Sequence, residues 1–223
     1  MMVVSTGRNA GSAAGLDAGV SASPDPDGCL FVNADVRLAP ACVAELWRAT
    51  ELPGRGIGAP RLVDESHQPQ WSLRREPRVD RTLGAVVTNA DEYVGDHTLD
   101  WATGGASLVT ADCVAQMGQL GESIFRCSLE TDYALRARGA VLVVCQSSRA
   151  EAVHIGRDVH ESSAPHNGMT RSRVVPYRRR HRLVPSIAFW GATLLNEVLR
   201  SGSAVHRSAV GELVCGSSTL LRA

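Results

Sequence analysis

The stretch DWATGGASLVTADCVAQMGQLGESIFRCSLETDYALRARG (residues 100–139) holds the features that decide the fold class. Its apolar run at 107–109 is typical of a buried strand, and residues 111–120 have the spacing of a short helix. Residues 129–139 predict a second helix that ends at a glycine, and the run VLVVC (141–145) predicts another buried strand. Strands and helices that alternate in this way predict an α/β fold.

Two carboxylates, Glu130 and Asp132, open the second of these helices. The helix dipole stabilises negative charge in the first turn by about 0.3–1 kcal/mol, so both residues can simply be solvated helix-start acids. Residues two positions apart on a helix point in different directions. If the pair belongs to an active site, we therefore expect the two acids to have different roles.

A second candidate site follows the apolar run CLFV (29–32), which is suited to a buried parallel strand. Ligands of open α/β sheets bind beyond the carboxyl ends of the strands, where Asn33 and Asp35 would lie. A carboxylate at that place can hold Mg²⁺ or Mn²⁺ against a diphosphate, although Asp35 can also merely cap a turn. His154 follows the strand after residue 140 in the same sense, and imidazole with carboxylate suits Mn²⁺. A structural histidine is the alternative.

Small residues mark two further stretches. The Gly/Ala-rich segment 7–19 predicts a helix that lies close to the sheet, or a backbone that a ligand can approach. It is not a phosphate loop, because no G-K-[ST] follows. Trp101 with the pair Gly104 and Gly105 predicts either a floor for a ring-shaped ligand or the start of a strand with a buried tryptophan.

The charge balance and the cysteines limit the classes to which this protein can belong. The 223 residues carry 23 basic and 23 acidic side chains, a balance that does not indicate a nucleic-acid partner. The six cysteines form no C-x-x-C pair and no metal-ligand spacing, which favours reduced thiols. The first residues lack the pattern of a signal peptide, so we expect a cytoplasmic protein.

The C-terminal part combines an arginine cluster at 171–182 with the apolar segment 183–199. This segment is at the short end for a membrane span and contains Pro185, Asn196 and Glu197, which favours an interfacial or packing helix. Basic residues beside an apolar face suit peripheral docking at the anionic inner face of the cell membrane. A helix that packs on the preceding domain is the alternative. We expect a domain over 1–165 and a basic, amphipathic helical tail over 166–223.

The order of the pieces resembles glycosyltransferase family 2, in its rhamnosyltransferase-like or galactofuranosyltransferase-like branches. The pieces are RNAGSAAGLDAGV, FVNADVRLAP, DWATGGASLV, SLETDYALRARGA, AVHIGRD and YRRRHR, and the resemblance covers roughly residues 3 to 182. It implies a GT-A fold, with a mostly parallel sheet flanked by helices. It also implies an inverting transfer of a sugar, such as rhamnose, from a nucleotide-sugar donor to a cell-envelope glycan or lipid-linked acceptor.

The resemblance also implies roles for individual residues. Asp35 matches the last acid of the D-x-D-like motif and His154 the histidine that completes the Mn²⁺ or Mg²⁺ site. Glu130 falls on the general base of the family's acidic motif, and Asp132 matches the following acid, with a structural or acceptor-orienting role. The remaining matched positions lie on the substrate-binding side: Asn9, Gly15, Asn33, Trp101, Gly104 and Gly105.

Members of the family begin with strands that grip the nucleobase and ribose, and this sequence starts after them. The alternative to an active transferase is therefore an N-terminally truncated, inactive or partner-dependent remnant that only binds glycan.

Overall fold

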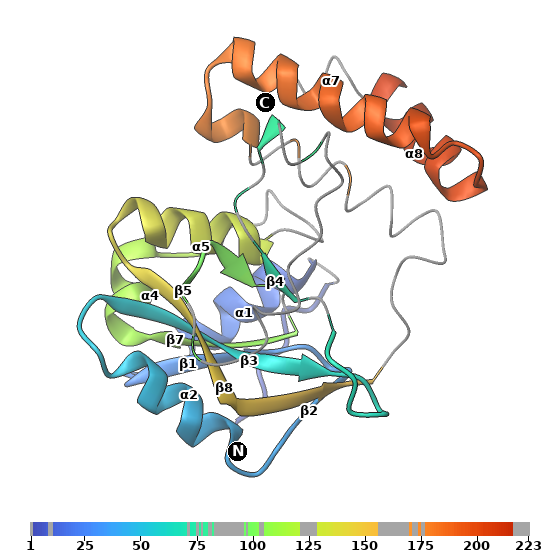
Figure 1. The fold of residues 1–223 in the computed structure, drawn as a ribbon. Helices are drawn as coiled ribbons and strands as arrows, with labels where there is room; N and C mark the ends of the chain where they lie inside the picture. Colours follow the sequence, from blue (N-terminus) through green and yellow to red (C-terminus); the bar gives the residue numbers. More distant parts are fainter. Residues whose placement is uncertain are drawn as a thin grey trace. The chain divides into compact units, whose positions relative to one another are not determined.

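A computed structural model describes residues 2–8, 11–70, 72–74, 96, 98–102, 105–120, 129–155 and 177–215, with positions 76, 78, 79, 82, 170 and 174. The chain forms two compact units. Unit 1 comprises Met1–Arg75 and Thr88–Gly156, and unit 2 comprises Glu76–Val87 and Arg157–Ala223 (Figure 1). Residues 76–87 thus belong with the C-terminal part of the chain.

A six-stranded sheet forms the centre of unit 1. Its main path runs β1 (Gly28–Val32), β7 (Ala106–Thr110), β3 (Arg55–Val63), β8 (Val143–His154) and β2 (Val36–Leu38). The short strand β5 (Thr98–Leu99) also pairs with β8, while β4 (Leu73–Arg74) and β6 (Trp101–Ala102) form a separate pair. With helices packed on this sheet, the predicted α/β class is confirmed.

The expectation of a mostly parallel sheet is wrong. Among the described strands, β3 and β8 pair in parallel, whereas β1 with β7, β7 with β3, and β8 with both β2 and β5 pair antiparallel. The reason is that a short apolar run encodes burial and not the direction of its neighbours. The run in β1 is equally compatible with either pairing.

One face of the sheet is covered by α2 (Cys42–Thr50), whose Cys42 and Leu46 are fully buried against Leu62 and Leu108. The helix approaches β3 at Gly58, where an added Cβ would lie 3.3 Å from the carbonyl oxygen of Leu46. The glycine therefore sets the close packing of this layer.

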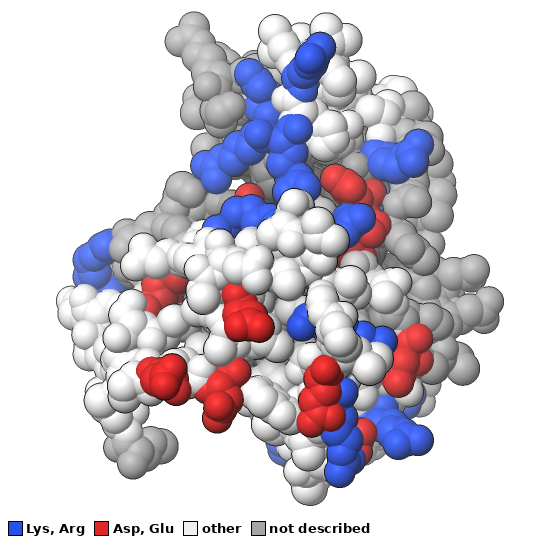
Figure 2. All heavy atoms as spheres, turned by 90° about the vertical axis from the view of Figure 1, so that its left-hand side faces the viewer, with Lys and Arg blue, Asp and Glu red and all other residues white. Residues whose placement is uncertain are grey.

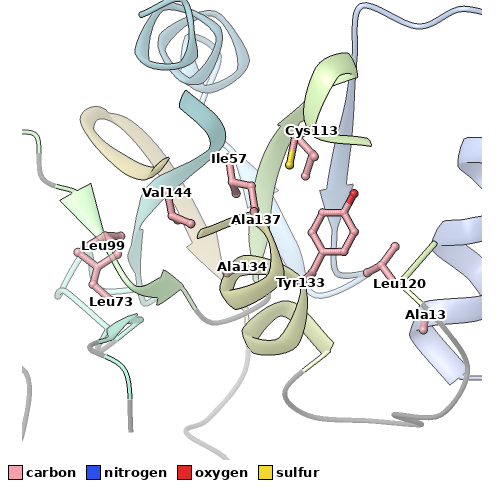
Figure 3. Packing of buried hydrophobic residues seen from close by; sticks show 11 residues of the cluster. Ala13, Ile57, Leu73, Leu99, Cys113, Leu120, Tyr133, Ala134, Ala137 and Val144 are labelled. Carbon is pink, nitrogen blue, oxygen red and sulfur yellow. The ribbon is translucent and has the colours of Figure 1, made fainter. Parts of the chain in front are cut away.

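The opposite face carries α1 (Gly11–Ser21), α4 (Ala111–Met117) and α5 (Leu129–Gly139), as Figure 1 shows. The core of this layer includes Ile57, Val109 and Val144 of the sheet and Tyr133 of α5. Figure 3 shows the Tyr133 ring beside Cys113 and Leu120. The helix predicted over 129–139 and the strand predicted at 107–109 are present in this half of the unit. The helix predicted over 111–120 is also present but ends at Met117, before Gly118.

Unit 2 contains the helices α7 (Leu183–Leu199) and α8 (Ala204–Cys215). Its buried cluster comprises Val174, Phe189 and Leu213, and the Tyr177 ring stacks on Phe189 with centroids 4.0 Å apart. Over the described parts of the chain, no helix has both the length and the apolar character needed to cross a membrane.

Candidate functional site

A cavity of about 270 Å³ opens in unit 1 between α1, α5 and the end of β1. Most of its wall is apolar, and the polar side chains of Ser12, Asn33, Ser107 and Glu130 are spread around it. Apolar walls with a few polar groups are characteristic of small-molecule sites. The other lining residues are Gly15, Leu16, Phe31, Val32, Ala34, Ile57, Ala102, Val109, Leu120, Tyr133, Ala134 and Val144.

The geometry of α5 explains which of its side chains reach the cavity. Glu130, Tyr133 and Ala134 have the i, i+3, i+4 spacing that places residues on one helix face, and all three line the cavity. Asp132 lies on another face, where its Oδ2 accepts a hydrogen bond from Nε of Arg136 at 3.0 Å. The two acids therefore have different surroundings, as their spacing predicts.

Tyr133 is a buried residue of the cavity wall. Burial raises the pKa of this phenol well above its ordinary value, and only 3% of the residue is exposed. The hydroxyl therefore stays protonated over the physiological pH range. Sequence analysis did not identify Tyr133 as a site residue, although its position three residues after Glu130 would have indicated it.

Arg136 fastens α5 to the segment after α4. Besides Asp132, its guanidinium donates hydrogen bonds to the carbonyl oxygens of Met117 at 2.9 Å, Gln119 at 3.1 Å and Leu120 at 3.4 Å. The Leu120 amide in turn donates to Oδ1 of Asp17 on α1 at 2.8 Å. Because Leu120 lines the cavity, these bonds fix one wall between the two helices.

The turn after β1 forms another wall. The Asn33 amide donates to the Gly105 carbonyl at 3.0 Å and the Val36 amide to the Asn33 carbonyl at 3.2 Å. Gly105 is tightly enclosed, because an added Cβ would lie 2.7 Å from Cδ1 of Leu62. Gly105 thus supports the backbone of Asn33 and does not itself line the cavity.

The same turn brings Asp35 to the end of β8. Val36 is in register with His154, and the amide of Ile155 donates to the Asp35 carbonyl at 2.7 Å. As a result, Oδ2 of Asp35 lies 3.4 Å from Nε2 of His154. The two residues that sequence analysis assigned to a metal are therefore brought together.

Gln70 orients the imidazole of His154. Its Oε1 lies 2.9 Å from Nδ1 of the ring. Nε2, the other ring nitrogen, faces the carboxylate of Asp35. Gln70 was not predicted as a site residue, because the sequence around it carries no signal of this role.

A carboxylate and an imidazole that face each other in this way suit a shared divalent cation. A carboxylate oxygen and a neutral imidazole nitrogen are both ligands of Mn²⁺, and a hydrogen bond to the other ring nitrogen is the usual support for a ligating histidine. Among the described residues, no group of three or more His, Cys, Asp or Glu gathers around one point. A cation held by Asp35 and His154 would thus take its other ligands from water and substrate.

The other predicted site residues are distributed differently. Gly15 lines the cavity, as does Ala102, whereas the adjacent Trp101 is half-buried against the hydrophobic core. Asn9 and Gly104 lie outside the described residues.

Neither a scan against protein-family models nor a search of curated proteins found a match to this chain.

Proposed function

We propose that this chain is an inverting glycosyltransferase that moves a sugar, with rhamnose as the first candidate, from a nucleotide-sugar to a glycan or lipid-linked acceptor. One observation carries the proposal. Glu130 lines the same cavity as Asn33 and Ala34, and these two residues lead directly into Asp35, which contacts His154. The proposed base, substrate cavity and cation ligands would thus belong to one region of unit 1.

Glu130 would accept the proton of the acceptor hydroxyl as that oxygen attacks the anomeric carbon of the donor. An alcohol is a weak nucleophile until its proton is taken, and a positioned base contributes about 10²–10⁴ in rate. In a single displacement the bond from the sugar to the diphosphate breaks while the bond to the acceptor oxygen forms. The proton passes to the carboxylate, and the leaving group departs as a nucleoside diphosphate.

Asp35 and His154 are the residues that would hold Mn²⁺ or Mg²⁺, with Gln70 fixing the imidazole. A divalent cation supplies charge neutralisation for a leaving diphosphate. Asn33, which lines the cavity two positions before Asp35, would donate or accept hydrogen bonds at a sugar hydroxyl.

The wall around Glu130 suits a sugar as the substrate. Phe31 and Ala102 offer apolar surface for the C–H face of a ring, while Asn33 and Ser107 offer polar contacts. Asp132, held by Arg136 away from the cavity, has a structural role in this proposal.

The proposal is tested by incubating the full chain with a panel of nucleotide-sugars, starting with dTDP-rhamnose, and measuring the release of nucleoside diphosphate. We expect release with Mn²⁺ and none after chelation. Binding of glycans without release from any donor would favour the non-catalytic alternative. The rate of nucleoside diphosphate release is then compared between glycan acceptors and lipid-linked acceptors, and the faster reaction identifies the acceptor class.

A further inference from the structure

One face of α7 is an exposed apolar stripe. Successive residues of an α-helix are separated by about 100°, so residues 184, 187, 188, 191, 195, 198 and 199 share roughly one third of its circumference. None of them is polar or charged. The large side chains among them are well exposed: Val184 77%, Ile187 45%, Leu195 47%, Val198 44% and Leu199 75%. We call these seven residues the α7 stripe.

The stripe is not the face that holds unit 2 together. The buried residues of α7 lie on the opposite side and include Phe189 at 1%, Ala192 at 5% and Thr193 at 4% exposure. Trp190 donates from Nε1 to the carbonyl of Leu213 on α8 at 3.4 Å, and Asn196 donates to the carbonyl of Thr82. Among the described residues of unit 2, the contacts that hold α7 thus lie on the side away from the stripe.

The only acid of α7, Glu197, is also turned away from the stripe. Its exposure is 6%, and its Oε2 lies 2.6 Å from Nδ1 of His206. The exposed surface of α7, a helix described along its whole length, therefore carries no negative charge. An anionic partner would meet no repulsion there.

Basic residues lie beyond both ends of the helix. The exposed arginines 179, 180 and 182 precede or cap its N-terminus, and Arg200 and Arg207 follow its C-terminus. Figure 2 shows a group of neighbouring blue side chains at the upper end of the face that it draws. Every one of the 23 basic residues of the chain is arginine, whose planar guanidinium binds phosphate oxygens through two hydrogen bonds.

We propose that the α7 stripe docks in the interface of an anionic phospholipid membrane, with the helix in the membrane plane and the flanking arginines on lipid phosphates. An apolar helix face bordered by basic residues is the arrangement that binds such interfaces. At 1.5 Å per residue, the 17 residues of α7 lie along about 25 Å of membrane surface.

A second copy of the chain fits the stripe less well than a lipid surface. In an antiparallel pair of α7 helices, Arg180 and Arg182 of one copy would meet Arg200 and Arg207 of the other, and in a parallel pair each cluster would meet itself. Both arrangements bring like charges together, which is unfavourable. The docking does not depend on the proposed transferase activity, so either proposal can fail alone.

The test is the sedimentation of the full chain with vesicles of phosphatidylglycerol and phosphatidylcholine, compared with vesicles of phosphatidylcholine alone. We expect binding to the anionic vesicles that weakens with added salt and is at least tenfold weaker without phosphatidylglycerol. The variant Leu195→Gln should lower the partition coefficient about tenfold, because a leucine no longer enters the apolar layer. The double variant Arg180→Gln with Arg182→Gln should make binding to the anionic vesicles less dependent on salt.

Val43→Gln is the matched control, since Val43 is a helix residue of α2 with 43% exposure, close to that of Leu195. It should bind like the unmodified chain, and unchanged thermal unfolding of both variants checks that the fold is kept. Equal binding to both kinds of vesicle, or unaltered binding of Leu195→Gln, would overturn the proposal. So would self-association that Leu195→Gln abolishes in the absence of vesicle binding.

Discussion

Nε2 of His154 lies 3.4 Å from Oδ2 of Asp35, although one residue ends β8 and the other belongs to the turn after β1. The contact results from the pairing of β2 with β8, which puts Val36 opposite His154. Gln70 contacts the other ring nitrogen, Nδ1, so that Nε2 faces the carboxylate. This arrangement makes the proposed cation site testable without any knowledge of the substrate.

Removing either ligand should weaken Mn²⁺ binding. In Asp35→Asn the anionic oxygen is lost, and in His154→Ala the imidazole is lost, so each variant should bind Mn²⁺ at least about tenfold more weakly. The dissociation constant is measured by titration calorimetry or by the electron paramagnetic resonance of free Mn²⁺. Glu65→Gln, an exposed carboxylate in another turn, is the control and should bind as the unmodified chain does. Equal affinities in all four proteins would remove Asp35 and His154 from the metal site.

Alanine variants of two glycines in α1 test the stability of the helix and ligand binding in the cavity separately. An added Cβ at Gly15 or at Gly19 meets nothing within 4 Å, and Gly15 lines the cavity whereas Gly19 does not. Both alanine variants should therefore raise the free energy of unfolding, by up to about 1 kcal/mol, because alanine is the better helix former. Gly15→Ala should also weaken the binding of a cavity ligand, measured by calorimetry, and Gly19→Ala should not. Equal ligand affinity in the two variants would argue that the cavity is not the binding site.

The hydrogen bonds of Arg136 should contribute strongly to stability. Arg136→Ala removes the donor to three carbonyl groups and to Asp132, and we expect a loss of about 2–3 kcal/mol in urea unfolding. Asp132→Asn keeps the three carbonyl bonds, so it should cost less. Arg48→Ala, which removes an exposed pair with Glu45, should change stability by less than about 1 kcal/mol. A larger loss for Asp132→Asn than for Arg136→Ala would show that the three carbonyl bonds are not the main source of this stabilisation.

Alkaline pH should destabilise unit 1 through its buried thiols. Burial raises the pKa of Cys42 and of Cys113 from 9.0 to about 11 in the folded chain. Between about pH 9 and 11 the unfolded chain has therefore lost protons that the folded chain still binds, and the free energy of unfolding falls as pH rises. The slope per thiol is at most about 1.4 kcal/mol per pH unit. Urea midpoints at pH 8, 9 and 10 measure it, and Cys113→Ala should show a shallower decline. A stability that stays constant over this range would disprove the assignment.

Local pattern predicted the elements of unit 1 well where one signal dominates. The apolar run before Asn33 and the helix that opens at Leu129 are present because burial periodicity and a terminal glycine act over a few residues. The direction of β1 against β7 could not be predicted in the same way, since it depends on a partner strand far along the chain. The inclusion of residues 76–87 in unit 2 depends on such distant contacts as well.

In the candidate site too, local pattern predicted some residues, and others depend on long-range pairing. Glu130 and Asn33 were identified from sequence, and both line the cavity. Tyr133 could have been predicted from helix spacing, because it lies one turn from Glu130. Gln70 could not be predicted, because its amide is bonded to Leu62 of β3 and its contact with His154 exists only after β3 and β8 have paired. Long-range pairing is thus what sequence pattern leaves undetermined.

The measurement that most directly tests the central proposal is Mn²⁺-dependent sugar transfer by the variant Glu130→Gln. The substitution keeps the size of the side chain and removes the group that accepts the proton. Transfer should fall by about 10² or more, while Mn²⁺-dependent nucleotide binding stays unchanged. Glu65→Gln should transfer at the rate of the unmodified chain. Undiminished transfer by Glu130→Gln would show that Glu130 is not the base.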